Sequence, residues 1–352
     1  MGDVILTARR AAGMTQEELA EQLGIQQATL SRYENNTRTP EPDMVARLAA
    51  ALSLTPEFLS SSFSRMQGAL AGDVHMRRQR TAKVSHWKSG EARLNMYRMR
   101  SAFLLDRIGM RPQNQVPTFE LDTAATATPA DAARLTRSQW RMPIGPVRNL
   151  TRWLESAGVL IFEEDFDTHR IDGMSQWASD YPVIIVNAAQ TTDRRRWTLA
   201  HELGHLVLHS VFVVDDREME RQADEFAAEF LMPKHLIEPD LSVLKPARLI
   251  DLKATWGVSM QAIYERAYQF GRVTGEERTR FYRSLNARGW KANEPGADRI
   301  PPEHPALAAT IGEALLDKGL DRQEVLAMTG SSGDADHDQF IPARVGGLKL
   351  IR

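Results

Sequence analysis

A short apolar segment with two histidines constrains this chain more than any other feature. Residues 194–208 read RRRWTLAHELGHLVL, and this pattern predicts a mostly apolar helix. His201 and His205 are four residues apart, so both imidazoles project from one helix face, with Glu202 beside them. Burying two imidazoles and a carboxylate is costly unless a partner binds them. A divalent metal ion is such a partner.

A second predicted helix begins near residue 217 and offers acidic groups to the same site. Glu220 and Asp224 are four residues apart and share a face. Glu220 can therefore be the third metal ligand, while Asp224 accepts a hydrogen bond from a ligating imidazole. Glu218 is the main alternative for the third ligand. Two histidines and one glutamate leave a fourth position open for water, which is the pattern of a catalytic zinc site.

Glu202 is expected to be the general base of such a site. It would lie beside the metal, where it can take a proton from water and deliver it to a leaving amine. His209 follows one helical turn after the second histidine. We expect it to support a ligand or to belong to the core, because a fourth protein ligand would close the open position. Sequence spacing does not choose the group that stabilises the oxyanion. The candidates are Tyr181, Tyr264, His209 and Arg266.

Sulfur plays no part in this site, because the 352-residue chain contains no cysteine. That absence excludes thiolate catalysis, disulfides and cysteine-based zinc sites, and it suits a reducing cytosol. Zinc is the expected metal, with manganese as the alternative. The longest apolar runs, 158–162 and 183–186, fall far short of the ~18 residues that a membrane-spanning helix needs. We therefore expect a cytoplasmic, nucleoid-associated protein with no membrane partner.

The first sixty residues predict five short helices. Gly13 ends the first, and Thr15 and Glu18 form a capping box that opens the second. Gly24 then turns the chain into a third helix over 26–35. Two short helices joined by a glycine-containing turn are typical of a module that enters the major groove of DNA. The alternative is a small helical protein-interaction domain. The remaining two helices are predicted over 43–52 and from residue 55.

Residues 15–36, TQEELAEQLGIQQATLSRYENN, resemble the phage-repressor-like (XRE-type) helix-turn-helix family. The resemblance implies that Gln16 and Asn35 contact phosphates of a double-stranded operator. Glutamine pairs with adenine, arginine with guanine, and an alanine methyl can touch thymine. A homodimer would suit such a reader, because the class usually spans two half-sites. The residues at or beside the base-reading positions are Gln26, Gln27, Ala28, Thr29 and Arg32.

Charge is distributed unevenly behind a net charge of −2. Residues 1–60 carry −3 and no lysine, residues 61–111 carry +8, and residues 112–352 carry −7. The basic segment could add phosphate attraction to the acidic DNA reader. Alternatively, it is a helix that docks on the acidic remainder of the chain. Its basic runs are Arg77, Arg78, Arg80 and Lys83, then Arg93, Arg98, Arg100 and Arg107.

Residues 194–209, RRRWTLAHELGHLVLH, and 218–233, EMERQADEFAAEFLMP, together resemble the ImmA/IrrE-type metallopeptidases. The likeness extends over residues 75–295. It implies zinc ligands at His201, His205 and Glu220 and a general base at Glu202. It also implies a zincin-like fold in which residues 181–187 form the strand beside the cleft, where an extended peptide could add by main-chain pairing. Related peptidases of the family cut a helix-turn-helix repressor.

The expected fold is α+β and mostly helical, with a five-helix repressor-like helix-turn-helix domain before a metallopeptidase domain that holds a small sheet. The leading hypothesis is a DNA-binding transcriptional regulator with a zinc-dependent endopeptidase that cleaves a helix-turn-helix repressor, another protein or itself. A non-proteolytic transcription factor with a metal-binding sensor or oligomerisation module is the first alternative, and an antitoxin-like or phage-immunity DNA binder the second. The expected parts are the DNA-binding domain 1–60, a basic helical connector 61–111, the peptidase domain 112–300, and a C-terminal extension 301–352.

Overall fold

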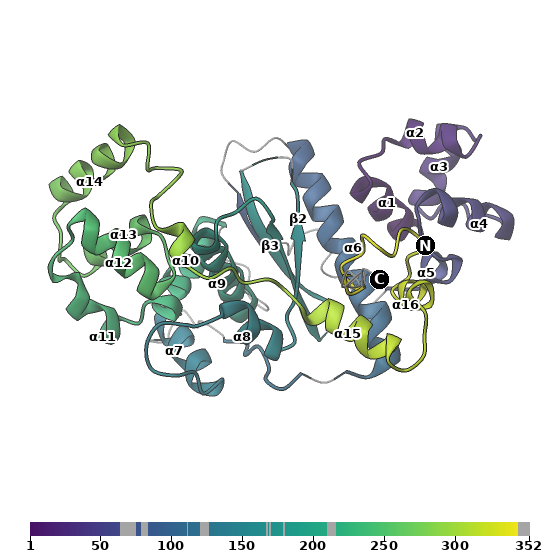
Figure 1. Cartoon of the computed structure of the whole chain (residues 1–352). Helices are drawn as coiled ribbons and strands as arrows, with labels where there is room; N and C mark the ends of the chain where they lie inside the picture. The colour runs from purple at the N-terminus through teal and green to yellow at the C-terminus, as the bar shows by residue number, and fades with distance from the viewer. Residues whose placement is uncertain are drawn as a thin grey trace, which may run out of the picture.

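The described part of the chain is mostly helical and contains one small sheet (Figure 1). Five N-terminal helices are followed by a long helix, a four-stranded sheet, a helical body and two final helices. The predicted α+β, mostly helical class is confirmed. The computed structural model describes residues 1–63, 75–78, 84–110, 112–119, 127–166, 168, 170–178, 180–209 and 216–343.

The five predicted N-terminal helices are all present. The capping box forms as expected, because Thr15 Oγ1 accepts from the Glu18 backbone N–H and the Glu18 carboxylate accepts from the Thr15 backbone N–H. Leu19, Leu30 and Phe58 are fully buried and hold these helices around one core. The helices are α1 (Gly2–Ala11), α2 (Gln16–Gln22), α3 (Gln27–Glu34), α4 (Pro42–Ala51) and α5 (Pro56–Ser60).

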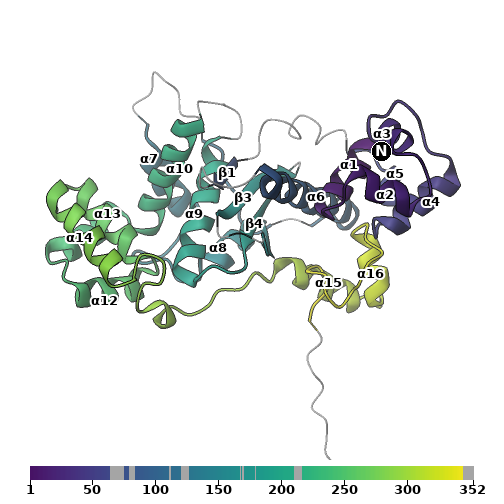
Figure 2. The same cartoon turned by 90° about the horizontal axis from the view of Figure 1, so that it is seen from above.

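The sheet is covered on its two faces by different helices, α6 (Val84–Ile108) and α9 (Thr192–Leu208) (Figures 1 and 2). Side chains alternate along its strands, as a pleated strand requires. Leu160 and Phe162 pack in the core on the α6 side, and Ile161 packs in the core on the α9 side. The strands are β1 (His75–Arg78), β2 (Leu160–Glu164), β3 (Ile171–Ala178) and β4 (Tyr181–Asn187), in the order β1-β3-β4-β2.

The strand β4 lies inside the sheet, contrary to the expectation that it borders the cleft. It pairs parallel with β2 on one side and antiparallel with β3 on the other. Its backbone donors and acceptors are therefore used within the sheet, and an added peptide cannot pair with residues 181–187. The outer strands of the described sheet are β2 and β1, and β1 contacts α9.

The helical body surrounds α9 on the side away from the sheet. The helix α10 (Asp216–Leu231) packs directly along α9, and Gly204 permits this approach. A Cβ at Gly204 would lie 3.2 Å from the Cα atom and the backbone oxygen of Ala223. The other elements are α7 (Pro129–Gln139), α8 (Leu150–Ser156), α11 (Lys234–Ile237), η2 (Glu238–Ser242), α12 (Pro246–Trp256), α13 (Met260–Gln269), α14 (Gly275–Ala287) and η3 (Ala297–Arg299).

The arginines of the basic connector that lie on α6 are occupied within the chain. Arg93 pairs with Glu164, and Arg98 is buried and donates to the backbone oxygen of Trp177. Arg100 bonds Asp338, and Arg107 bonds Glu57. These four arginines therefore support the expectation that the basic segment docks on the rest of the chain, rather than the expectation that it attracts phosphates. Arg80, Lys83 and the side chains of Arg77 and Arg78 lie outside the described residues.

The C-terminal extension packs against the five N-terminal helices. Its helices are α15 (Leu307–Leu316) and α16 (Arg322–Met328). The backbone N–H of Thr55 donates to Gly330, and Leu54 forms a β-bridge with Ser331. The core of the five helices therefore continues through α6 into α16. The end of the chain, 344–352, for which a strand or an unstructured tail was expected, lies outside the described residues.

Gly330→Ala is expected to destabilise the protein. Gly330 has φ +82°, and an added Cβ would overlap the ring of Phe58. We expect a loss of about 2 to 4 kcal/mol of unfolding free energy from backbone strain and overpacking together. Gly319→Ala is the matched control, because Gly319 has φ +97° but no neighbour within 4 Å of the added Cβ. Thermal unfolding should show the larger loss for Gly330→Ala, and equal losses would contradict the close packing on Phe58.

Candidate metal centre and DNA-reading surface

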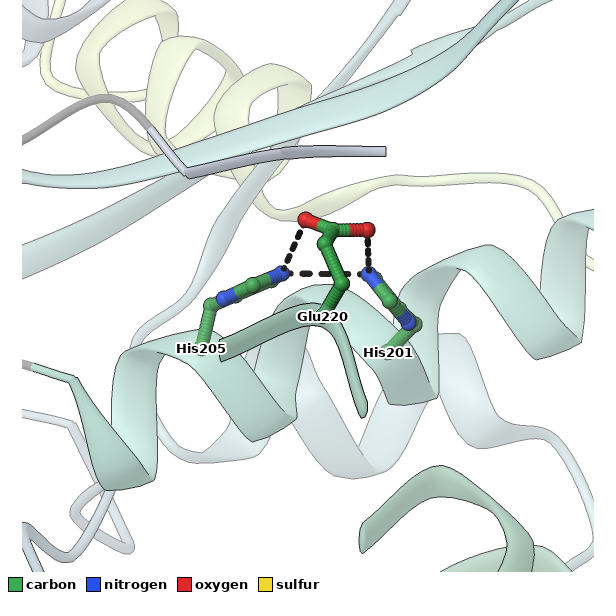
Figure 3. Close-up of side chains that lie close together, drawn as sticks. All are labelled: His201, His205 and Glu220. Carbon is green, nitrogen blue, oxygen red and sulfur yellow. Dashed lines mark hydrogen bonds and ion pairs between the residues drawn. The ribbon is translucent and has the colours of Figure 1, made fainter. Parts of the chain in front are cut away.

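Three side chains from two helices meet at one point, as Figure 3 shows. His201 and His205 project from α9, and Glu220 projects from α10. Their potential ligand atoms all lie within 4.8 Å of one another. The two Nε2 atoms are 3.1 Å apart, and the Glu220 oxygens lie 3.5 Å from His201 Nε2 and 3.3 Å from His205 Nε2. This donor set of two imidazoles and one carboxylate fits a divalent metal ion.

The protein environment keeps the carboxylate of this cluster ionised. Burial alone would raise the pKa of Glu220, but the hydrogen bonds and charge of His201 and His205 outweigh it and hold the pKa well below its ordinary value. Both imidazoles are buried, whereas Glu220 is half-buried. An ionised oxygen donor therefore faces two ring nitrogens at neutral pH, as a metal site requires.

The outer nitrogens of both imidazoles contact further polar groups. His201 Nδ1 lies 2.9 Å from Asp224 Oδ1, so a ring that donates there would turn its Nε2 lone pair to a metal ion held in the cluster. His205 Nδ1 lies 3.0 Å from His209 Nδ1, and His209 Nε2 lies 2.9 Å from the Gln222 side-chain oxygen. The amide oxygen can only accept, so His209 donates to it from Nε2 and accepts from His205 at Nδ1. His209 and Asp224 thus lie where a supporting role requires.

Gln222 is the member of this chain of hydrogen bonds that sequence reasoning missed. Its position on α10, two residues after Glu220, gave no separate signal, because a glutamine on an acidic helix is ordinary. It also donates to Glu218 Oε1 at 2.9 Å. Burial lowers the pKa of His209, which keeps this ring neutral and able to accept from His205.

Glu218, the alternative third ligand, is engaged away from the cluster. Both of its carboxylate oxygens accept from the Arg221 guanidinium, at 2.9 and 2.7 Å. These hydrogen bonds lower the pKa of Glu218 to about 2. It stands outside the group of three that converges on one point. The geometry therefore favours Glu220 over Glu218.

Glu202 lies on the sheet side of α9 and is completely buried. Its backbone oxygen accepts from Ser175 Oγ of β3 at 3.3 Å. Gly173 lets β3 approach this side chain, because a Cβ there would lie 3.6 Å from Glu202 Cγ and only 2.6 Å from the Thr198 methyl carbon. Glu202 thus directly follows His201 in the sequence, and its carboxylate lies outside the three converging groups.

A cavity of about 810 Å³ adjoins the cluster and reaches Glu220 and Asp224. It continues between α9, α13 and the segment around Glu294. Arg266 is the one oxyanion candidate among its described lining residues, and it also bonds Glu229. Tyr181 donates to the backbone oxygen of Met110. The third candidate, Tyr264, stacks on the ring of Phe281. The fourth, His209, contacts His205.

Asp224→Ala is expected to weaken metal binding about 10- to 100-fold, because the His201 ring loses the group that orients it. The adjacent Glu225→Ala is the control, since Glu225 bonds only Arg221 among the described contacts. Competition titration with a chromogenic chelator measures both affinities. Equal affinity of Asp224→Ala and the wild type would show that the contact does not support the site.

The predicted DNA contacts lie on α2, on α3 and at the two residues that flank α3. Gln27 donates to the side-chain oxygen of Gln16, and Gln16 donates to Glu34 at 2.6 Å. Glu34 is in turn held by two hydrogen bonds from Arg9. The Asn35 amide donates to the backbone oxygen of Ser31. Gln26, Gln27, Ala28, Arg32 and Asn35 are exposed, and Gln16 and Thr29 are half-buried.

Arg9 and Glu34 are buried and were not anticipated as part of this surface. They fix the orientation of Gln16, which then fixes Gln27. No clear sequence signal marks this pair, because Arg9 stands beside Arg10 and Glu34 lies in the mostly polar run 31–36.

The helices of the described residues give no segment with the length and apolar character needed to cross a membrane.

Comparison with known proteins divides the chain into two recognised regions. Residues 5–59 match the helix-turn-helix family model. Residues 154–268, which contain the histidine and glutamate cluster, match a peptidase family described as the IrrE N-terminal-like domain. No curated protein matches the chain significantly. The chain therefore joins an XRE-type helix-turn-helix domain to an ImmA/IrrE-like peptidase domain.

Proposed function

We propose that this protein is a DNA-binding transcriptional regulator whose peptidase domain cleaves a helix-turn-helix repressor, either another protein or its own chain. The observation that carries the proposal is the convergence of His201, His205 and Glu220 beside a cavity, together with the buried Glu202 on the helix that carries both histidines. A purely structural metal site would not need that glutamate. The fused DNA reader puts the peptidase near other repressors at an operator, in the cytoplasm and at the nucleoid.

Zinc is the proposed metal because imidazole nitrogens suit it, and manganese is the alternative because a carboxylate oxygen suits that ion. When bound, the metal supplies Lewis-acid activation of a carbonyl group and of water. Glu202 takes the proton of the attacking water and returns it to the amine that leaves when the peptide bond breaks. Asp224 keeps His201 in the required tautomer, and His209 does so for His205.

The substrate would bind as an extended strand along β1. This outer strand contacts α9, the helix that carries both histidines. Main-chain hydrogen bonds along such an edge accept many sequences, while pockets for alternate side chains select among them. The cavity beside Glu220 is the proposed pocket for side chains next to the scissile bond.

The DNA reader would place α3 in the major groove of a double-stranded operator. Gln27 is oriented by Gln16, so its amide is fixed before binding and can meet an adenine edge. Arg32 is exposed one turn further along α3 and can reach guanine. A homodimer would bring two such helices to successive half-sites.

Arg32→Ala is expected to cost about 1 to 3 kcal/mol in operator binding and to relax discrimination at one base position, because a guanine contact is lost. Arg38→Ala is the control, since Arg38 lies beyond α3 over the ring of Tyr33. Affinities for the operator and for single-base variants, measured at fixed salt, give the comparison. Equal losses on all sequences would argue against base reading by Arg32.

The proteolytic proposal is tested by incubating the zinc- or manganese-loaded chain with candidate helix-turn-helix repressors, with and without operator DNA. Cleavage of one repressor, or of the chain itself, is the expected result. No cleavage of any partner, with operator binding intact, would favour the non-proteolytic sensor instead.

A further inference from the structure

A second cavity, of about 800 Å³, lies between the end of α7 and α8. Among the described residues, none lines both this cavity and the one beside the metal cluster. Three arginines (Arg141, Arg148 and Arg152) and two tryptophans (Trp140 and Trp153) contribute to its wall. Neither proposed activity uses any of these side chains.

The three arginines present positive charge to the cavity. All three are exposed, and none forms a side-chain hydrogen bond or salt bridge with the part of the chain that the structure describes. Glu155 interacts electrostatically with Arg152. Its carboxylate, however, accepts hydrogen bonds from the backbone N–H groups of Ala306 and Leu307. Three cations around one concavity suit a ligand with several negative oxygens.

The backbone around this cavity is strained in two places. Arg141 has φ +52° and Asn149 has φ +48°, in the left-handed region that favours glycine. Arg141 follows the C-terminus of α7, where its N–H bonds Ser138 and the next N–H bonds Arg137, which is the Schellman arrangement. Glycine would satisfy that turn with less strain. An arginine in this backbone conformation points to a role for its side chain.

The tryptophans add a flat apolar surface to the basic wall. Trp140 is buried, and its indole N–H is held by the backbone oxygen of Gln115 at 2.9 Å. Trp153 is half-buried and remains available on the cavity side. Aromatic faces of this kind stack on nucleobases, and the cavity volume lies within the range of small-molecule sites.

We propose that this cavity binds a free nucleoside phosphate, with Arg141, Arg148 and Arg152 on the phosphate oxygens and Trp153 against the base. A single concavity with one accessible tryptophan fits one nucleotide. A strand would need a groove with successive stacking platforms. The site would give the regulator a soluble ligand that is independent of its operator and of its peptide substrate.

The test is titration of the full-length chain with ATP after treatment with EDTA, so that the histidine cluster cannot hold a metal for the phosphates. Isothermal titration should give one saturable site. Inorganic tripolyphosphate should bind more weakly, and a thymidine oligonucleotide should not compete at matched phosphate concentration. Tripolyphosphate as tight as ATP would overturn the role of Trp153, and binding of the oligonucleotide alone would overturn a free nucleotide as ligand.

Substitutions of the three arginines test whether they hold the phosphate. Arg148→Ala combined with Arg152→Ala should weaken ATP binding by at least about tenfold. Arg283→Ala, an exposed arginine on α14 outside both cavities, should leave it unchanged. Arg141→Gly should weaken binding while raising the Tm, because the left-handed backbone is relieved. Unchanged ATP affinity in the double variant or in Arg141→Gly would overturn the proposal, and the Tm of each variant shows that it is folded.

Discussion

The Glu202→Gln variant is expected to bind zinc as the wild type does and to cleave its substrate about 10² to 10⁴ times more slowly. The amide has nearly the shape of the carboxylate but cannot take a proton from water. Glu202 lies outside the three converging ligand groups, so metal content should be preserved. Cleavage under single-turnover conditions, with metal content measured on the same samples, separates the two effects.

Glu225→Gln is the matched control for this charge change. It removes one carboxylate from the same pair of helices, at a group that bonds Arg221 on the surface. Its cleavage rate should equal that of the wild type. A Glu202→Gln protein with full activity would assign the proton transfer to another group and remove the main support for the proposed chemistry.

The Glu220→Ala variant is expected to lose most of its bound zinc on dialysis, because only two imidazoles of the donor set remain. Glu218→Ala should keep its zinc, since the Glu218 carboxylate is held by Arg221 away from the cluster. These two residues belong to the same helix and differ by two positions, which makes them a close comparison. Elemental analysis of the dialysed proteins gives the metal content per chain.

Zinc should also stabilise the folded wild-type protein by mass action. A ligand at about 100 times its Kd adds about 2.7 kcal/mol to the free energy of unfolding. The increase in Tm on adding zinc should therefore appear in the wild type and in Glu218→Ala, and should be much smaller in Glu220→Ala. Undiminished zinc content and stabilisation in Glu220→Ala would move the third ligand elsewhere.

Short-range patterns in the sequence predicted the parts of the site that lie on single helices. The four-residue spacing of His201 and His205 determines that both rings share a face, whatever surrounds the helix. The same logic placed Glu220 and Asp224 together on α10. Capping at Thr15 predicted the start of α2 for the same local reason.

Contacts between distant segments were beyond such patterns. The strands β1 and β3 were not anticipated, and β1 pairs with residues about a hundred positions away. The strand β4 proved to be internal because it pairs with β3 on one side and with β2 on the other, an order that its own apolar pattern does not determine. The docking of Gly330 beside Phe58 joins the C-terminal extension to the N-terminal helices, which are far away in the sequence. A charge count likewise could not show that α6 uses its arginines for docking. We propose that the chain divides into functional parts after residues 60, 111 and 300.

The most direct test of the peptidase proposal is mass spectrometry of a helix-turn-helix repressor after incubation with the zinc-loaded chain in H₂¹⁸O. Hydrolysis predicts one new carboxyl terminus carrying a single ¹⁸O atom and a matching new amino terminus. Both should be absent with Glu202→Gln. Intact repressors and an intact chain in every combination with zinc or manganese, while the protein still binds its operator, would contradict the proposal.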